Sequence, residues 1–155
     1  MGKTTFTGPI RAGNILNTSG VTVGKDVKNV GSVLMVQSFA VTQTTSNGQA
    51  TGVFKTDIVL PANSHIIAIQ FCNTVGWSGA ATVDIGTNAG GAELTSALAS
   101  PAVGITAATP GTDATRAGKW DDIGTSDVRI WVKSSATGTG VGTISVRYIQ
   151  AQDAV

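Results

Sequence analysis

The chain has 155 residues, a length that suggests one domain large enough to bury a core. Charged residues make up 12% of it, the formal net charge is +1, and no basic run forms, which argues against nucleic acid as the main partner. No stretch approaches the roughly 20 apolar residues that span a bilayer, and no signal-peptide run opens the chain, so we expect a soluble protein made in a cytoplasm.

The composition favours strands over helices. Threonine, valine and isoleucine number 22, 17 and 12, against 5 leucines, and 20 glycines can supply turns. Branching at Cβ suits the pleated surface of a sheet and costs side-chain freedom in a helix. The sequence therefore predicts an all-β fold.

The N-terminal part of the chain is glycine-rich and weakly patterned. We expect residues 1–30 to form an extended arm and a loop, and residues 31–155 to form a β-sandwich domain. The stretch TTFTGPIRAGN at 4–14 has no period of two or of 3.6. It is too apolar for an idle tail, so we interpret it as an arm that lies on a partner.

Four residues of this arm are the predicted contacts. Pro9 has no backbone N–H and disfavours helix at the residue before it, which keeps the segment extended. Phe6 and Ile10 are the expected apolar anchors, and Arg11 is expected to make a charge-assisted bond to an acidic neighbour. The arm would bind the surface of another protein or an adjacent subunit. The alternative is an arm that folds back as an edge strand of its own sandwich.

Six later segments have clear strand character, separated by turn signals. They are 33–43, 53–60, 64–72, 80–87, 127–134 and 141–152. Alternation with a period of two predicts an inward-facing set. This set is Ile67, Ile69, Phe71, Val83, Ile85, Val128, Ile130, Val132, Ile144 and Val146.

The connections are predicted from glycine, proline and asparagine. Asn47-Gly48 is a turn signal, PANS at 61–64 is a tight corner, and SATGTGVG at 135–142 is expected to be a flexible hairpin turn. Residues 88–100 are the one place where a short helical turn is plausible, and 101–120 predict one weak strand and an exposed loop. About seven or eight strands without a long amphipathic helix favour a β-sandwich, with the jelly roll as the preferred arrangement.

Candidate catalytic residues are scarce. His65 is the only histidine and Cys72 the only cysteine, so neither a disulfide nor a cysteine metal cluster is possible within the chain. We expect His65 to cap a strand corner and Cys72 to be a small buried packing residue. Strand alternation places the two on opposite faces and about 20 Å apart, which makes a nucleophile–base pair improbable.

Two further loops are candidate ligand sites. Asp121, Asp122 and Asp127 form the densest acidic cluster, and we expect solvated or salt-bridged turn residues, with a calcium site as the alternative. GTNAGG at 86–91 shares only its glycines with a phosphate-binding loop, because lysine and serine or threonine are missing where they are needed. It is predicted to be a turn.

The three tryptophans allow three interpretations. Trp77, Trp120 and Trp131 could anchor the core and loops, contact another protein, or form a platform for stacking sugars. Trp131 stands between Arg129 and Lys133 on the polar face of its strand. A large aromatic there fits a face that a neighbouring subunit half covers, so Trp131 is a predicted subunit contact.

Four stretches carry a resemblance to a known group of proteins. TTFTGPIRAGN, NVGSVLMVQS, VLPANSHIIAIQFCNTVGW and ATVDIGTNAGG resemble small virion proteins of marine tailed bacteriophages, of the head-decoration or capsid-cement type. The resemblance implies a jelly roll or related sandwich that forms a homotrimer on the outer surface of the head, with the major capsid protein as partner. It implies synthesis in the cytoplasm of the host bacterium and supplies no residue-level site.

Three classes of function compete at this point. The favoured one is a structural virion protein that decorates and stabilises the capsid. The alternative is a carbohydrate- or receptor-binding module of a phage head fibre or tail fibre. A small hydrolase ranks last, because one histidine, one cysteine and no nucleophile or metal motif leave it little chemistry. We expect no enzymatic activity, no cofactor and no metal site.

Overall fold

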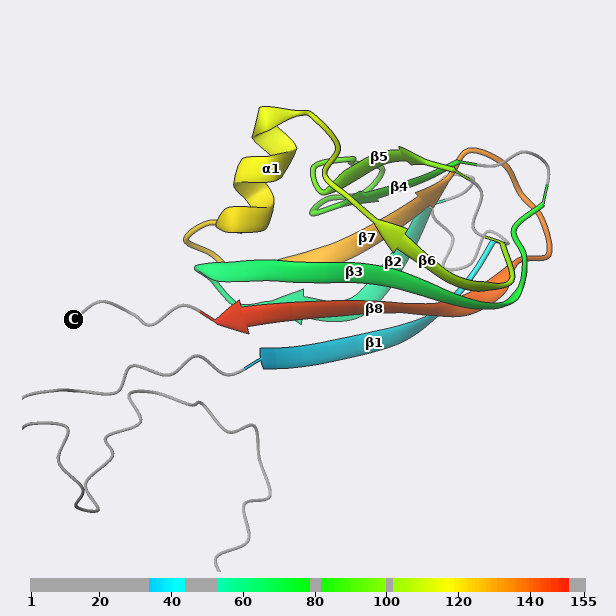
Figure 1. The fold of residues 1–155 in the computed structure, drawn as a ribbon, viewed down its shortest axis with the longest axis horizontal. Coiled ribbons are helices and arrows are strands. Elements are labelled where there is room, and N and C mark those ends of the chain that lie inside the picture. The colour runs from blue at the N-terminus through cyan, green and yellow to red at the C-terminus, as the bar shows by residue number, and fades with distance from the viewer. Residues whose placement is uncertain (1–33, 44–52, 79–81, 100–101, 151–155) are drawn as a thin grey trace, which may run out of the picture.

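The computed structural model describes residues 34–43, 53–78, 82–99 and 102–150, which form two antiparallel four-stranded sheets and one short helix (Figure 1). Sheet A has the order β1-β8-β3-β6 and sheet B the order β2-β7-β4-β5. The elements are β1 (Leu34–Thr42), β2 (Val53–Leu60), β3 (Ser64–Val75), β4 (Val83–Gly86), β5 (Thr95–Leu98), β6 (Gly104–Ala108), α1 (Ala114–Asp121), β7 (Val128–Ser134) and β8 (Val141–Gln150). The predicted all-β class is confirmed. The predicted arm and its boundary with the domain lie outside the described residues.

The chain passes from one sheet to the other at almost every connection. Among the described strands, β4 and β5 are the only two that follow each other in the chain and also lie in the same sheet. The stretch between β7 and β8 is therefore a crossing between sheets, and the hairpin predicted there is wrong. The tight corner predicted after β2 is confirmed, because Asn63 adopts a left-handed φ of 57° and its N–H bonds the Gly124 oxygen at 2.7 Å. Asn47-Gly48 lies outside the described residues.

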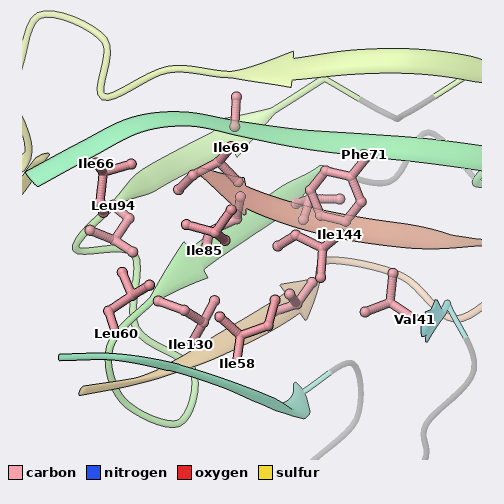
Figure 2. Close-up of a cluster of buried hydrophobic side chains, with 14 of the residues drawn as sticks. Val41, Ile58, Leu60, Ile66, Ile69, Phe71, Ile85, Leu94, Ile130 and Ile144 are labelled. Atoms are coloured by element: carbon pink, nitrogen blue, oxygen red, sulfur yellow. The ribbon is translucent and has the colours of Figure 1, made fainter. Parts of the chain in front are cut away.

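The space between the sheets is filled mainly by branched aliphatic side chains, together with the buried aromatic residues Phe71, Trp77 and Tyr148. Figure 2 shows side chains from both sheets pointing toward one another, among them Ile69, Phe71 and Ile144 from sheet A and Ile58, Ile85 and Ile130 from sheet B. Each buried aliphatic side chain contributes about 1.5–3 kcal/mol relative to an exposed one. Eight of the ten predicted inward residues are buried, Val128 is half-buried, and Ile67 is exposed.

A bulge in β3 explains the error at Ile67. The pairing of β3 with β8 shifts between Ile66 and Ala68, so Ile66 points into the core and Ile67 is left unpaired. A bulged residue reverses the alternation of every residue beyond it. The period-two prediction assumed one uninterrupted strand, and it therefore failed at this position.

Helix α1 lies near the start of β3, at one end of the sandwich (Figure 1). Asp113 is its N-cap, and its side chain accepts a hydrogen bond of 2.9 Å from the Arg116 N–H. This bond holds the pKa of Asp113 below its ordinary value of 3.8. The sequence predicted a loop here and a helical turn within 88–100, where the structure instead has turns and β5. The weak strand predicted in 101–120 is confirmed as β6.

Two glutamines join parts of the sandwich that the backbone ladders leave apart. Gln37, on edge strand β1, exchanges two hydrogen bonds with the backbone of Val59 on edge strand β2, at 2.7 and 3.1 Å. This pair links the two sheets at the edge where β1 and β2 meet. Gln43 is fully buried and bonds the loops that contain Ser78, Ala136 and Gly140.

Candidate contact surface

The outer face of sheet A is the most distinctive surface of the described residues. We call it the contact face. It consists of the outward residues of β1 (Leu34, Val36, Ser38, Ala40 and Thr42), of β8 (Val141, Thr143, Ser145, Arg147 and Ile149), of β3 (His65, Ala68, Gln70, Cys72 and Val75) and of β6 (Ile105 and Ala107), as the strand registers place them.

Exposed apolar side chains gather on this side of the molecule. Every large hydrophobic residue that is prominently exposed in the described part of the chain belongs to a strand of sheet A or directly precedes β6. The set is Leu34, Val36, Ile67, Val75, Val103, Ile105 and Val141, each between 41% and 70% exposed. Isolated exposed apolar residues are ordinary on proteins, but a set confined to one sheet marks a surface suited to a partner.

The contact face carries very little charge. Arg147 is its only permanently charged residue, and it lies between Val36 on β1 and Ala68 on β3. Small polar residues fill the middle, where the hydroxyls of Ser38 and Ser145 share a hydrogen bond of 2.8 Å across the two strands. A face with few charges loses little hydration when another surface covers it.

The outer face of sheet B has the opposite character. Arg129 and Lys133 on β7 form ion pairs with Asp57 and Asp84, at 3.0 and 3.9 Å. Trp131 stands between them, half-buried, and pairs across the sheet with Lys55 and Gly86. The predicted place of Trp131 on a charged strand face is therefore confirmed, whereas its role as a subunit contact stays a prediction.

His65 and Cys72 do not lie where alternation placed them. Their partners on β8 are Ile149 and Thr143, which are an even number of positions apart and so share one face of that strand. Both side chains are exposed on the contact face, and the predictions of opposite faces and of a buried Cys72 are wrong because of the bulge. His65 caps the strand corner as expected, with Nδ1 3.1 Å from the Asp121 backbone oxygen.

The acidic cluster serves local structure. Asp122 accepts from the Gly124 N–H and Asp127 from the Ala62 N–H, both at 2.9 Å, and Asp121 lies 3.9 Å from His65. These bonds match the expected turn and salt-bridge roles. Within the described residues, no group of three or more histidine, cysteine, aspartate or glutamate side chains is arranged to hold a metal ion.

The glycine-rich stretch 86–91 is a turn organised by a carboxylate. Glu93 accepts from the Thr87 N–H at 3.0 Å and from the Asn88 amide at 2.6 Å. Gly91 closes the turn by donating to the Asn88 oxygen at 3.1 Å. An acidic side chain thus occupies the donors that an anion would use in a phosphate-binding loop. The predicted turn is confirmed.

Two of the three tryptophans are structural anchors. Trp77 is buried, packs edge-on against Phe71 at 5.8 Å, and donates from Nε1 to Asn73 at 3.2 Å. Trp120 extends from α1 against the core and donates to the Leu94 oxygen at 2.8 Å. Both indole N–H groups are engaged inside the protein, which weakens the interpretation of the tryptophans as a sugar-stacking platform.

The predicted arm contacts Phe6, Pro9, Ile10 and Arg11 lie outside the described residues. The contact face itself was not predicted from the sequence. A signal for it was present in 34–41, where both alternating sets of residues contain large apolar side chains. When both faces of an edge strand are apolar, one face packs on the core and the other is left exposed for a partner.

Comparisons with known proteins give limited similarity. No family model and no curated protein matches the chain. Among solved structures, it resembles a chain described as "Cyanophage Pam1 capsid asymmetric unit", with 17% identity and a TM-score of 0.45, over 88% of this chain and 99% of that one. Within the described residues, no helix has the length and apolar character needed to cross a membrane.

Proposed function

We propose that the protein is a structural protein of a phage virion that decorates the outer surface of the assembled head and stabilises it as a homotrimer. The observation that carries the proposal is the contact face, an apolar and nearly uncharged sheet surface set against a charged opposite face. This asymmetry is typical of a protein whose task is contact. The sequence resemblance to head-decoration proteins supplies the setting, in which the major capsid protein is the partner.

We also infer that the sandwich is a jelly roll. The strand orders contain the pairs β1–β8, β2–β7, β3–β6 and β4–β5. These are the pairs formed when one long antiparallel ribbon, with β4 and β5 at its tip, wraps around a core. Eight strands in two sheets with repeated crossings are the ordinary form of this fold.

Such a protein stabilises a capsid by mass action. A ligand that binds only the assembled shell shifts the equilibrium toward that shell, by an amount set by its concentration and affinity. Three linked copies bind more tightly than one, because the second and third contacts form at high effective concentration. An arm at residues 1–14 would add apolar footprint through Phe6 and Ile10, with Arg11 on an acidic neighbour. Pro9 would keep the arm extended.

The hydrogen bonds of the polar side chains favour a binding role over a catalytic one. His65, Asp122, Asp127 and Glu93 each hold a corner, a turn or a loop, and none faces another in a nucleophile–base arrangement. We therefore propose that the protein is not an enzyme. The fibre-module alternative needs exposed aromatic side chains in a concave site, and Trp77 and Trp120 are instead anchored in the core.

Capsid binding with an arm deletion tests the proposal. Purified full-length protein and a variant lacking residues 2–12 are incubated with capsids of the parent phage and separated by sedimentation. We expect the full chain to sediment with capsids, and the variant to remain folded but bind more weakly. The substitution Thr7→Ala, in the same arm, serves as a control that keeps both apolar anchors. If the deletion variant binds as tightly as the full chain, the arm is not the anchor. If the full chain does not bind, the proposed function is contradicted.

A further inference from the structure

We propose that the contact face is covered by a neighbouring copy of this chain, so that it is the self-association surface of the oligomer. The inference rests on the homotrimer in the proposed function and names the surface that builds it. Around a threefold axis, each contact face meets part of the contact face of both neighbours. The starting point is that the prominently exposed apolar residues of the described part of the chain lie on the strands of sheet A or directly before β6, with Leu34 and Val36 on one edge strand and Ile105 on the other. Such a set on a soluble monomer would favour aggregation.

The size of the face meets the requirement of a specific interface. The strands of sheet A are 5 to 12 residues long. Four strands of about nine residues, at about 3.3 Å per residue and about 4.8 Å between strands, cover roughly 600 Å². Three such faces around a threefold axis bury roughly 1,800 Å² in all, which lies within the range of area buried in stable protein–protein assemblies.

The composition of the face also fits a protein partner. Arginine is the charged residue that interfaces favour, because its planar group stacks and donates several hydrogen bonds, and Arg147 is the single such group here. Serine, threonine and alanine in the central rows keep the surface shallow, so a second backbone can approach closely. The β1–β8 ladder runs from Leu34 to Thr42 without a register shift, which keeps this part of the face regular.

A neighbouring copy is favoured as the occupant over the chain's own N-terminal segment 1–33. That segment carries four basic residues and one acidic residue. The contact face presents Arg147 and His65, so it offers no negative charge to hold a net basic segment. The faces of neighbouring copies bring the same low charge, so they lose little hydration when they cover one another.

Cys72 provides a direct probe of this surface. It is the only cysteine of the chain, it is exposed, and it sits between Thr143 on β8 and Ile105 on β6 in the register. The experiment measures the rate of its reaction with a maleimide across a dilution series of the full-length protein, together with molar mass by light scattering. We expect labelling at least about tenfold slower in the oligomer than in the dissociated protein, because only the dissociated copy reacts.

Charge insertions identify the face responsible. Val36→Glu and Ile105→Glu place carboxylates at exposed positions of the contact face and should reduce the mass to that of the monomer and restore fast labelling. Lys55→Glu, at an exposed position on the outer face of sheet B, is the matched control and should leave both readouts unchanged. If a variant fails to fold, the labelling rates of Cys72 in the unmodified protein still show whether the contact face is covered in the oligomer.

Three results would overturn the inference. One is an oligomer in which Cys72 reacts as fast as in the monomer. Another is a protein that stays monomeric at all concentrations. The third is a monomer whose Cys72 is protected at every dilution, which would place the chain's own N-terminal segment on the face. Capsid sedimentation is measured separately. An oligomer in which Cys72 is protected but which does not bind capsids supports the interface and contradicts the proposed function.

Discussion

Gln43 is the residue on which the most connections between loops depend. Its amide donates to the Ser78 and Ala136 oxygens at 2.7 and 3.2 Å, and its oxygen accepts from the N–H groups of Ser78 and Gly140 at 2.8 and 3.3 Å. Replacing it with alanine leaves these backbone groups without a partner and opens a cavity. We expect Gln43→Ala to lower the free energy of unfolding by about 2–4 kcal/mol in urea titrations.

Gln150→Ala is the matched control for this experiment. Gln150 is exposed at the end of β8, and its loss should change the free energy of unfolding by less than about 0.5 kcal/mol. If the two variants are equally stable, the buried amide does not hold the loops as described.

Ala97 is held in a conformation that L-residues avoid. Its φ is 51°, and its N–H donates to Asp84 at 2.8 Å, which fixes the backbone there. The left-handed region costs a residue with a Cβ about 1–2 kcal/mol, whereas glycine loses about 0.5–1 kcal/mol through chain entropy. We therefore expect Ala97→Gly to be stabilising by up to about 1 kcal/mol, seen as a higher melting temperature. Ala117→Gly, inside α1, should instead destabilise by about 1 kcal/mol, and a drop in both variants would refute the strain at Ala97.

At the scale of elements, the crossing between β7 and β8 is packed tightly. A Cβ on Gly140 would lie 2.5 Å from Trp77 Cδ1 and 2.9 Å from its Cα, and Gly140 accepts a hydrogen bond from the Gln43 N–H at 2.8 Å. We predict that Gly140→Ala destabilises by about 1–3 kcal/mol through overpacking. Gly118→Ala in α1 meets nothing within 4 Å and should stabilise by about 1 kcal/mol. Chemical denaturation gives the free energy of unfolding of both variants. If Gly140→Ala leaves it unchanged, the stretch between β7 and β8 is a flexible turn, as the sequence predicted, and is not tightly packed.

The start of α1 has a pH-dependent cap. The Arg116 N–H favours the charged form of Asp113, so the pKa of this carboxyl in the folded protein lies below 3.8. The cap therefore stabilises the folded state at pH values above 3.8 and loses this contribution as the pH falls through the lower folded value. An NMR titration should show the Arg116 amide signal moving with a midpoint below 3.8. A midpoint at or above 3.8 would mean that Asp113 does not cap the helix in solution.

Most strands could be predicted from the sequence, because alternation and turn residues are local signals. The bounds expected for β2, 53–60, are those observed, and β1, β7 and β8 differ by two positions at most. The bulge in β3 was not predictable in this way, since it depends on how β3 pairs with β8, the last strand of the chain. Helix α1 was missed because its sequence, ATRAGKWD, has no apolar period and relies on the Asp113 cap and the Trp120 anchor.

Across the whole molecule, the two outer faces differ because the outward positions of the strands carry different kinds of residue in each sheet. Outward positions of β7 carry Arg129 and Lys133, which pair with aspartates on neighbouring strands, whereas outward positions of β1 carry Leu34 and Val36. The sequence predicted a contact protein from its scarce catalytic residues, and it named Trp131 and four residues of the arm as contacts, which stay predictions. The contact face emerges only when the sheet order brings β1, β8, β3 and β6 side by side.

Electron microscopy of purified capsids of the phage proposed to encode the chain, with and without added full-length protein, would show whether the protein decorates the outer surface of a head. We expect ordered density in threefold clusters on the outer surface of the head, into which the two-sheet domain fits with sheet A against neighbouring copies. Bare capsids at saturating protein, or density confined to a fibre or the tail, would contradict the proposed function.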